Sequence, residues 1–429
     1  MEASTIVFII IGAMMVLYMT GWIPIATTSI LACLALAIFG VIPFTAAFAG
    51  FGNDIVFLIV GMLIVGDALF ETGVAPVLGK KIISVVGTNE KMYLAVLIVT
   101  TISVSLFLSN TAAASMMLPI AASAITASGG KLSKKNSFMI IGFAAVAGGG
   151  FTLVGSTPQL IAQAMLIEGG HEPMSFFELS YAGFPKAVLL LVYFMTIGYV
   201  LQKKVFNFPE IKDEAPPANP AGNQISTERT PKNVVRMYIS TGALIFCIVG
   251  FVSGLWSVGI VAMVGAIMCV LTGCISQKKV FQKMDWTTVT IMGCSFGIAA
   301  GVDRSGAGVL LAQAMINLFG DSMTPWILCA IFALIAIILG NVMSHTATAS
   351  ILIPIVVFVA MEMGYDVKSV VVATVIAANV TYLTPISTPP ITMTLVAGYR
   401  FMDYVKVGGL LNVLSYILII ALFPFILNI

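Results

Sequence analysis

Long apolar runs follow one another along nearly the whole chain of 429 residues, and short polar segments separate them. Because a helix needs roughly 20 apolar residues to cross a bilayer, we predict ten membrane spans. They lie near residues 5–20, 22–43, 54–74, 137–168, 181–201, 236–254, 257–275, 286–304, 367–398 and 404–427. A polar, proline-containing linker, 203–235, divides the chain into halves of 1–202 and 236–429. The pattern predicts an all-α polytopic membrane protein with five spans in each half.

Two further apolar stretches, 92–127 and 325–361, fit poorly as single straight spans. Each has about 36 residues, and a helix of that length would reach about 54 Å, whereas the hydrocarbon core is about 30 Å thick. A polar cluster lies in the middle of each stretch, and folding back at the cluster removes the mismatch. We therefore predict two re-entrant helix hairpins. The alternative for each stretch is a pair of full spans joined by a tight turn.

The two polar clusters are copies of one another. The sequence Ser-Asn-Thr-Ala-Ala-Ala-Ser at 109–115 recurs 235 residues later as Ser-His-Thr-Ala-Thr-Ala-Ser at 344–350. A second pair, Ser-Thr-Pro at 156–158 and 387–389, interrupts the spans 137–168 and 367–398. Polar, helix-breaking backbone is tolerated at membrane depth only where it is buried in protein or lines a cavity. Its duplication in two halves points to the central binding site of a transporter.

The distribution of charge predicts the orientation of the two halves. Only 9% of the residues are charged, as expected for a surface that mostly faces lipid. An outside N-terminus leaves 17 of the 20 basic residues in cytoplasmic segments, with Lys186, Arg304 and Lys368 outside. The pattern predicts inverted repeats in a bacterial plasma membrane, with both termini outside and the linker 203–235 in the cytoplasm. The net charge of +2 gives no reason to expect a nucleic-acid partner.

The broken helices supply a chemistry for binding ions. A helix that begins at a hairpin tip has unpaired N–H groups and positive partial charge, whereas a helix that ends there has unpaired carbonyls and negative partial charge. Helix starts therefore suit anions and helix ends suit small cations. The short polar side chains at the breaks could ligate Na⁺ or bind an anion without burying a fixed charge. They are Ser109, Asn110, Thr111, Thr157, Ser344, Thr346 and Thr388.

The paired Ser-Asn-Thr-type tips, each followed by a Thr-Pro break in the next span, resemble the divalent anion/sodium symporter family of the ion-transporter superfamily. The resemblance covers both halves. It implies a homodimer in which a scaffold domain supports a mobile transport domain that moves as an elevator. It also implies sodium-driven uptake of a small divalent anion, for example a C4-dicarboxylate such as succinate.

The resemblance implies roles for individual residues. A first sodium site would use Ser105, Ser109, Asn110 and the chain at Ser156. A second, altered site would fall at Gly340, Met343, His345 and Ser387. The substrate carboxylates would meet residues of both halves, namely Ser109, Asn110, Thr111, Thr157, Pro158, Ser344, His345, Thr346, Thr388 and Pro389.

The second half departs from the family pattern at two positions. His345 stands where an amide is expected, and Gly340 lacks the hydroxyl that Ser105 supplies in the first half. In the first half, Gln159 replaces a proline. His345 has two interpretations. It could merely replace the amide as a hydrogen-bonding group, or it could carry a proton and take the place of one sodium ion.

Three other functions compete with a sodium symporter. The first is a proton-coupled permease or an exchanger for citrate, sulfate or another oxyanion, with His345 replacing one sodium site. A membrane enzyme is disfavoured, because a catalytic set is hard to assemble from a chain whose two histidines are His171 and His345. A channel is disfavoured because two dead-end hairpins do not form a continuous polar stripe.

Overall fold

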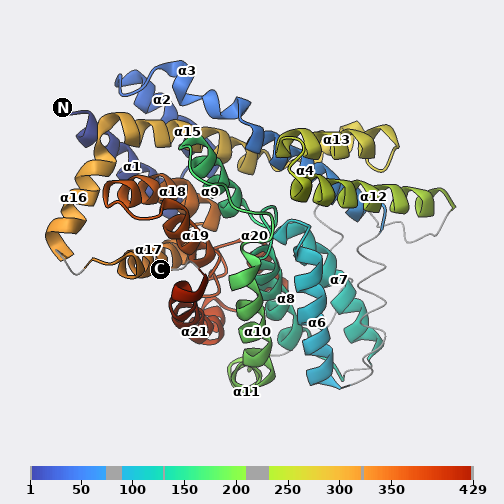
Figure 1. Ribbon diagram of the computed structural model, residues 1–429. Coiled ribbons are helices and arrows are strands. Elements are labelled where there is room, and N and C mark those ends of the chain that lie inside the picture. Colours follow the sequence, from blue (N-terminus) through green and yellow to red (C-terminus); the bar gives the residue numbers. More distant parts are fainter. Residues whose placement is uncertain (1, 74–88, 129–130, 209–230, 320–322, 427–429) are drawn as a thin grey trace.

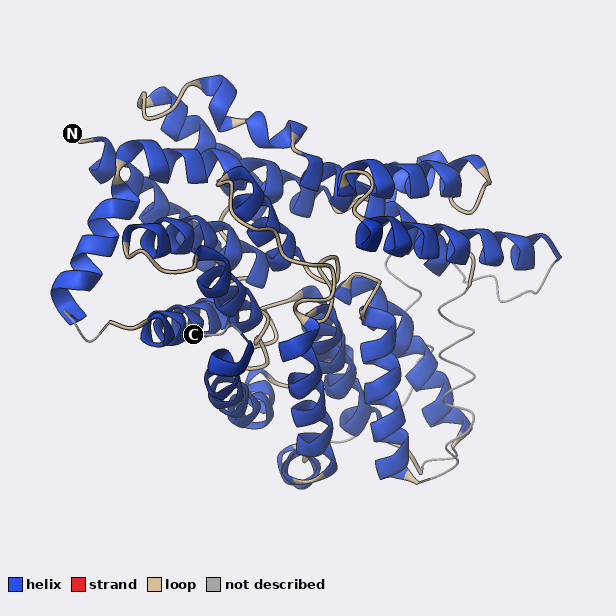
Figure 2. Cartoon of the chain, viewed as in Figure 1, coloured by secondary structure: helices blue, strands red, loops and turns tan. Residues whose placement is uncertain are grey.

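The computed structural model describes residues 2–73, 89–128, 131–208, 231–319 and 323–426. Every regular element in these ranges is a helix, as predicted (Figure 2). The first half contains α1 (Ala3–Thr20), α2 (Ile25–Ile38), α3 (Phe44–Ala47), η1 (Ala49–Gly52), α4 (Asp54–Glu71), α6 (Glu90–Ser105), α7 (Asn110–Ala127), α8 (Lys134–Gly149), α9 (Thr157–Glu168), α10 (Ser180–Met195) and α11 (Ile197–Val205).

The described residues of the second half are also built of helices. It contains α12 (Pro231–Ser253), α13 (Val258–Leu271), α14 (Gln277–Lys283), α15 (Trp286–Ser305), α16 (Ala307–Phe319), α17 (Pro325–Val342), α18 (His345–Glu362), α19 (Val367–Ala378), α20 (Pro389–Thr392), η3 (Met393–Ala397) and α21 (Phe401–Ile426). The helices break at all four places where the sequence has its polar copies.

Five helices in the described ranges are long and apolar enough to cross a membrane, and the bent pair α10–α11 makes a sixth candidate. The five are Ala3–Thr20, Val234–Ser253, Pro325–Val342, His345–Glu362 and Phe401–Pro424. Three shorter apolar helices, α2, α13 and α19, accompany them. These helices and the apolar surface identify an integral membrane protein.

Helices of the two halves pack against each other in matched pairs. In the upper part of Figure 1, α4 lies along α13, and α15 lies along α2. The bounds of α2 and α13 differ by 233 residues, and α4 and α15 are shifted by nearly the same amount. The contact between α4 and α13 is close, because a Cβ on Gly61 would lie 2.5 Å from the backbone carbon of Ala262. Small residues allow such approaches between membrane helices.

Several predicted segments differ from the observed helices. The predicted span 181–201 is two helices that meet at a bend of 52°, because Thr196 leaves the helical region at φ −121° and ψ −101°. The helices α14 and α16 were not predicted, and the predicted linker is shortened at both ends by α11 and α12. The helix α14 buries Val280. Its Lys279 and Lys283 both pair with Glu71 at the end of α4, which gives this carboxylate a structural role.

Candidate substrate and cation site

The tip of the first predicted hairpin lies between α6 and α7. The helix α6 ends at Ser105, and α7 begins at Asn110. Ser109 caps α7, since its hydroxyl oxygen accepts a hydrogen bond from the N–H of Ala112 at 3.3 Å. This cap fixes the N-terminus of α7 at the break, where its remaining N–H groups carry positive partial charge. Thr111, in the first turn of α7, is exposed.

Four polar groups converge behind this tip. The Ser105 hydroxyl donates to the carbonyl oxygen of Ala145 in α8 at 2.7 Å. One end of the Asn110 amide lies 3.0 Å from Ser105 Oγ, 3.0 Å from Ala145 O and 3.2 Å from Gly155 O. With its nitrogen turned this way, the amide donates to these oxygens. With its oxygen turned this way, it completes a set of oxygens from α6, α7, α8 and the break that follows α8.

The hydrogen-bond pattern favours the orientation with the nitrogen inward, and only the opposite orientation gives the residues of the first predicted sodium site a set of oxygens for a small hard cation. Unwound carbonyls and the C-terminal ends of broken helices are the groups that coordinate Na⁺ in many secondary transporters. Ser105 and Asn110 are both buried, and Gly155 supplies a main-chain oxygen next to Ser156. The hydroxyl of Ser156 itself is engaged elsewhere, because it donates to Asn379 Oδ1 at 2.8 Å.

Gly149 and Gln159 of the first broken span pack next to Asn110. A Cβ on Gly149 would lie 2.0 Å from Asn110 Oδ1, so only glycine fits at this position. Gln159 donates from Nε2 to the carbonyl oxygen of Gly149 at 2.7 Å. The glutamine that replaces the expected proline therefore caps the end of α8. In the same turn of α9, Pro158 is buried and Thr157 is half-buried.

The tip of the second predicted hairpin is shorter. Only Met343 and Ser344 separate α17 from α18. Ser344 repeats the role of Ser109, since its hydroxyl oxygen accepts from Ala347 N at 3.1 Å. His345 and Thr346 form the buried first turn of α18.

Several buried polar atoms of α18 and of the unwound chain after α19 have no hydrogen-bond partner in the described ranges. They include Nδ1 of His345 and the hydroxyl oxygens of Thr348, Thr381 and Thr388. Leaving a buried polar group without a partner destabilises the fold by about 1–3 kcal/mol. These atoms are therefore available to form hydrogen bonds with a bound solute. Thr388 precedes α20, where Pro389 is exposed.

The second predicted cation set fits Na⁺ less well than the first. Neither Gly340 nor Met343 offers a side-chain oxygen. The hydroxyl of Ser387 lies 3.0 Å from Thr381 O and 2.9 Å from Thr384 O, and is therefore committed to the backbone. Any cation held here would depend on main-chain carbonyls and on the His345 ring.

The two halves of the site are joined across the breaks. The Ser156–Asn379 hydrogen bond connects the first broken span with the end of α19. In addition, α18 packs against α9, and α7 packs against α20. Each hairpin therefore lies beside the helix that restarts in the other half.

A polar residue that sequence reasoning missed organises the second broken span. Asn341, near the end of α17, donates to Ile337 O at 2.8 Å and to Val380 O at 3.0 Å. Its own side-chain oxygen accepts from Leu383 N at 2.8 Å. Asn341 thus holds the unwound chain after α19 against the hairpin, a role that requires an amide with both donors and an acceptor.

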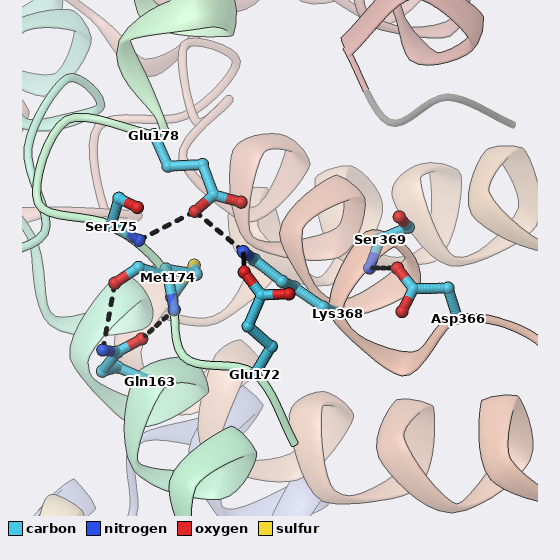
Figure 3. A network of polar contacts seen from close by, with 8 residues as sticks. All are labelled: Gln163, Glu172, Met174, Ser175, Glu178, Asp366, Lys368 and Ser369. Carbon is cyan, nitrogen blue, oxygen red and sulfur yellow. Dashed lines mark hydrogen bonds and ion pairs between the residues drawn. The ribbon is translucent and has the colours of Figure 1, made fainter.

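An ion-pair network fastens the connection between α9 and α10 to the start of α19 (Figure 3). Lys368 Nζ lies 2.8 Å from Glu172 Oε1 and 3.1 Å from Glu178 Oε2. Gln163 supports the same connection by bonding both the N–H and the carbonyl of Met174. The network therefore fixes Lys368, which is predicted to lie outside, next to this connection.

We expect Lys368→Gln to lower the melting temperature of the purified protein by a few degrees, and Glu172→Gln to lower it less. Glu172 is 79% exposed, whereas Glu178 is 21% exposed, and a solvent-exposed ion pair contributes only about 0–1 kcal/mol. Thermal unfolding of the two variants in detergent checks this order. Equal decreases in melting temperature for the two variants would show that the ion pair between Lys368 and Glu178 does not stabilise the protein.

A family model described as "Citrate transporter" (CitMHS) matches residues 15–378 and, in an overlapping match, residues 257–428. The chain belongs to this family. It is a transporter rather than an enzyme, and the resemblance to the divalent anion/sodium symporters of the ion-transporter superfamily is confirmed.

Named relatives of this CitMHS-family chain extend over almost its whole length. An uncharacterized transporter of Haemophilus influenzae is 26% identical over 94% of the chain and 88% of the relative. The sodium-dependent dicarboxylate transporter SdcS of Staphylococcus saprophyticus is 24% identical over 95% and 83%. SdcS of Staphylococcus aureus is 25% identical over 96% and 84%. The crystal structure of the Alcanivorax borkumensis YdaH transporter shares the fold, with a TM-score of 0.57 and 15% identity over 89% of this chain and 88% of YdaH.

Proposed function

We propose that this CitMHS-family chain is a secondary active, sodium-coupled symporter of a small divalent organic anion such as a C4-dicarboxylate. The observation that carries the proposal is the convergence of Ser105, Asn110, Ala145 O and Gly155 O behind the first tip. It offers Na⁺ a ligand set next to a helix start that suits a carboxylate. The names of the SdcS relatives support the same cargo and coupling ion.

The proposal includes the domain organisation and topology. The repeats 1–202 and 236–429 are inverted, the hairpins 92–127 and 325–361 are re-entrant, and the linker 203–235 is cytoplasmic. The matched pairs α4–α13 and α2–α15 support the repeats. Burial of Met343 and His345 supports a tip inside the membrane, although α17 and α18 are each long enough to cross it. The proposed homodimer and elevator motion rest on the resemblance.

Uptake into proteoliposomes tests the function. With an inward Na⁺ gradient, we expect labelled succinate or citrate to accumulate, and we expect little uptake when choline replaces Na⁺. Unlabelled anion inside the vesicles should accelerate entry of the label, which happens in a carrier but not in a channel. Uptake that ignores both Na⁺ and internal anion would refute a sodium-coupled carrier.

A second candidate function is favoured by one observation. The Nδ1 atom of the buried His345 has no partner in the described ranges, and the second cation set is poor in oxygen. A protonated imidazole there would place a positive charge beside the anion and couple its transport to protons. The chain would then be a proton-coupled permease or an exchanger for citrate, sulfate or another oxyanion.

The pH dependence of uptake separates the two functions. If His345 carries the coupling proton, wild-type uptake should change with pH. We expect His345→Asn, which restores the amide of the first tip, to flatten this change. Identical pH profiles for the two proteins would leave His345 as a hydrogen-bonding group only.

A further inference from the structure

A lysine is buried between the two broken spans. Lys186 was expected in an outer segment, but only 3% of its surface is exposed. It lies in α10, and its Nζ donates to the carbonyl oxygen of Ile376 at 3.3 Å. A Cβ on Gly150 would lie 3.3 Å from the same Nζ. No carboxylate in the described ranges forms an ion pair with it.

The surroundings of this ammonium explain how it is tolerated. Gly150 directly follows α8, and Ile376 lies in the last turn of α19. The ends of both helices carry negative partial charge, so they attract a cation placed between them. An isolated ammonium in a medium of low dielectric is costly. The two helix ends offset part of that cost, and a bound anion would offset more.

The position of Lys186 also connects it with the candidate site. Gly150 is adjacent to Gly149, whose Cα faces the amide of Asn110. Ile376 lies three residues before Asn379, which bonds Ser156. The close packing of α10 keeps the ammonium in place, because Ser180 donates to Phe151 O at 2.8 Å.

We propose that Lys186 is a tethered cation of the binding centre, which supplies positive charge for the divalent anion without a bound ion. This deepens the proposed function and rests on it. In many secondary transporters, helix ends hold a coupling cation. Here the ends of α8 and α19 face the ammonium of Lys186, which is part of the chain. The second predicted cation site has few side-chain oxygens, which is consistent with the binding of one Na⁺ ion instead of two.

Thermal unfolding of the purified chain in detergent tests the proposal without measuring transport. All six cysteines are buried, so a thiol-reactive dye reports unfolding. In choline chloride without Na⁺, we expect succinate or citrate to raise the melting temperature of the wild type and of Lys186→Arg. We expect Lys186→Gln to lose this shift, or to need at least tenfold more anion, and to recover it with Na⁺. Lys204→Gln, on an exposed lysine of α11, is the control.

Three results would overturn the proposal. The first is a wild-type melting temperature that succinate or citrate raises only when Na⁺ is present. This result does not depend on whether Lys186→Gln folds. The second is an unchanged Na⁺-free shift in Lys186→Gln, which would make the lysine a purely structural cap of α8 and α19. The third is no shift by either anion, with or without Na⁺. That result rejects the proposed cargo class, and the role of Lys186 with it.

Discussion

Asn110→Ala is expected to reduce sodium-driven uptake roughly 10- to 100-fold. The change removes the group that lies within 3.2 Å of Ser105 Oγ, Ala145 O and Gly155 O, and it leaves these buried oxygens facing one another. The loss of a buried polar partner costs about 1–3 kcal/mol. The Asn110 side chain contacts the helix break, and it does not support the packing of the surrounding helices. The protein should therefore still fold. Uptake of labelled succinate at several Na⁺ concentrations measures the effect.

Ser103→Ala provides the control for this experiment. Ser103 lies on the same helix as Ser105, but it is exposed, and its hydroxyl bonds the carbonyl of Val99 one turn earlier. Its removal should leave both uptake and the Na⁺ dependence unchanged. If Asn110→Ala transports as well as Ser103→Ala does, the cation and substrate assignments at the first tip are wrong.

Gly149→Ala is expected to abolish transport and to destabilise the protein. The added methyl group would lie 2.0 Å from Asn110 Oδ1, so either the tip of the hairpin or the end of α8 has to move. Overpacking of this kind costs about 1–3 kcal/mol, and the displaced group is the one that assembles the first cation set. The melting temperature and the uptake should therefore fall together.

Gly242→Ala is the matched change for Gly149→Ala. Gly242 lies inside α12, and nothing lies within 4 Å of its added methyl group. Because alanine is favoured over glycine in a helix by about 0.5–1 kcal/mol, this variant should be as stable as the wild type or slightly more stable. A Gly149→Ala protein that behaves like Gly242→Ala would mean that Asn110 can move without consequence.

The positions of the helix breaks could be predicted because they are duplicated. The copies at 109–115 and 344–350 lie in apolar stretches of a length that no single span can use, so length and polarity together locate the tips. The same reasoning identified Ser109 and Ser344, and both cap the helices that restart there. Helix capping is a local property, so the sequence contains most of the information needed to predict it.

The bend at Thr196 and the helices α14 and α16 could not be predicted in this way. Hydropathy reports that a segment is apolar, but it does not report whether the segment is straight, and α14 has too few apolar residues to register as a span. The predicted site also lacked Asn341, Asn379 and Lys186. These residues have no counterpart among the duplicated motifs, and their contacts depend on how helices distant in sequence are packed.

The unequal pairing of polar atoms at the two tips has a consequence for selectivity. At the first tip, Ser105 and Asn110 hydrogen-bond each other, whereas Nδ1 of His345 at the second tip has no partner in the described ranges. One end of a bound substrate would therefore contact the first tip, where the polar groups are fixed, and the other end would contact the second tip, where His345 can still form a hydrogen bond. Such a carrier should distinguish the two ends of an unsymmetrical molecule. Among chiral acids such as malate, it should prefer one enantiomer.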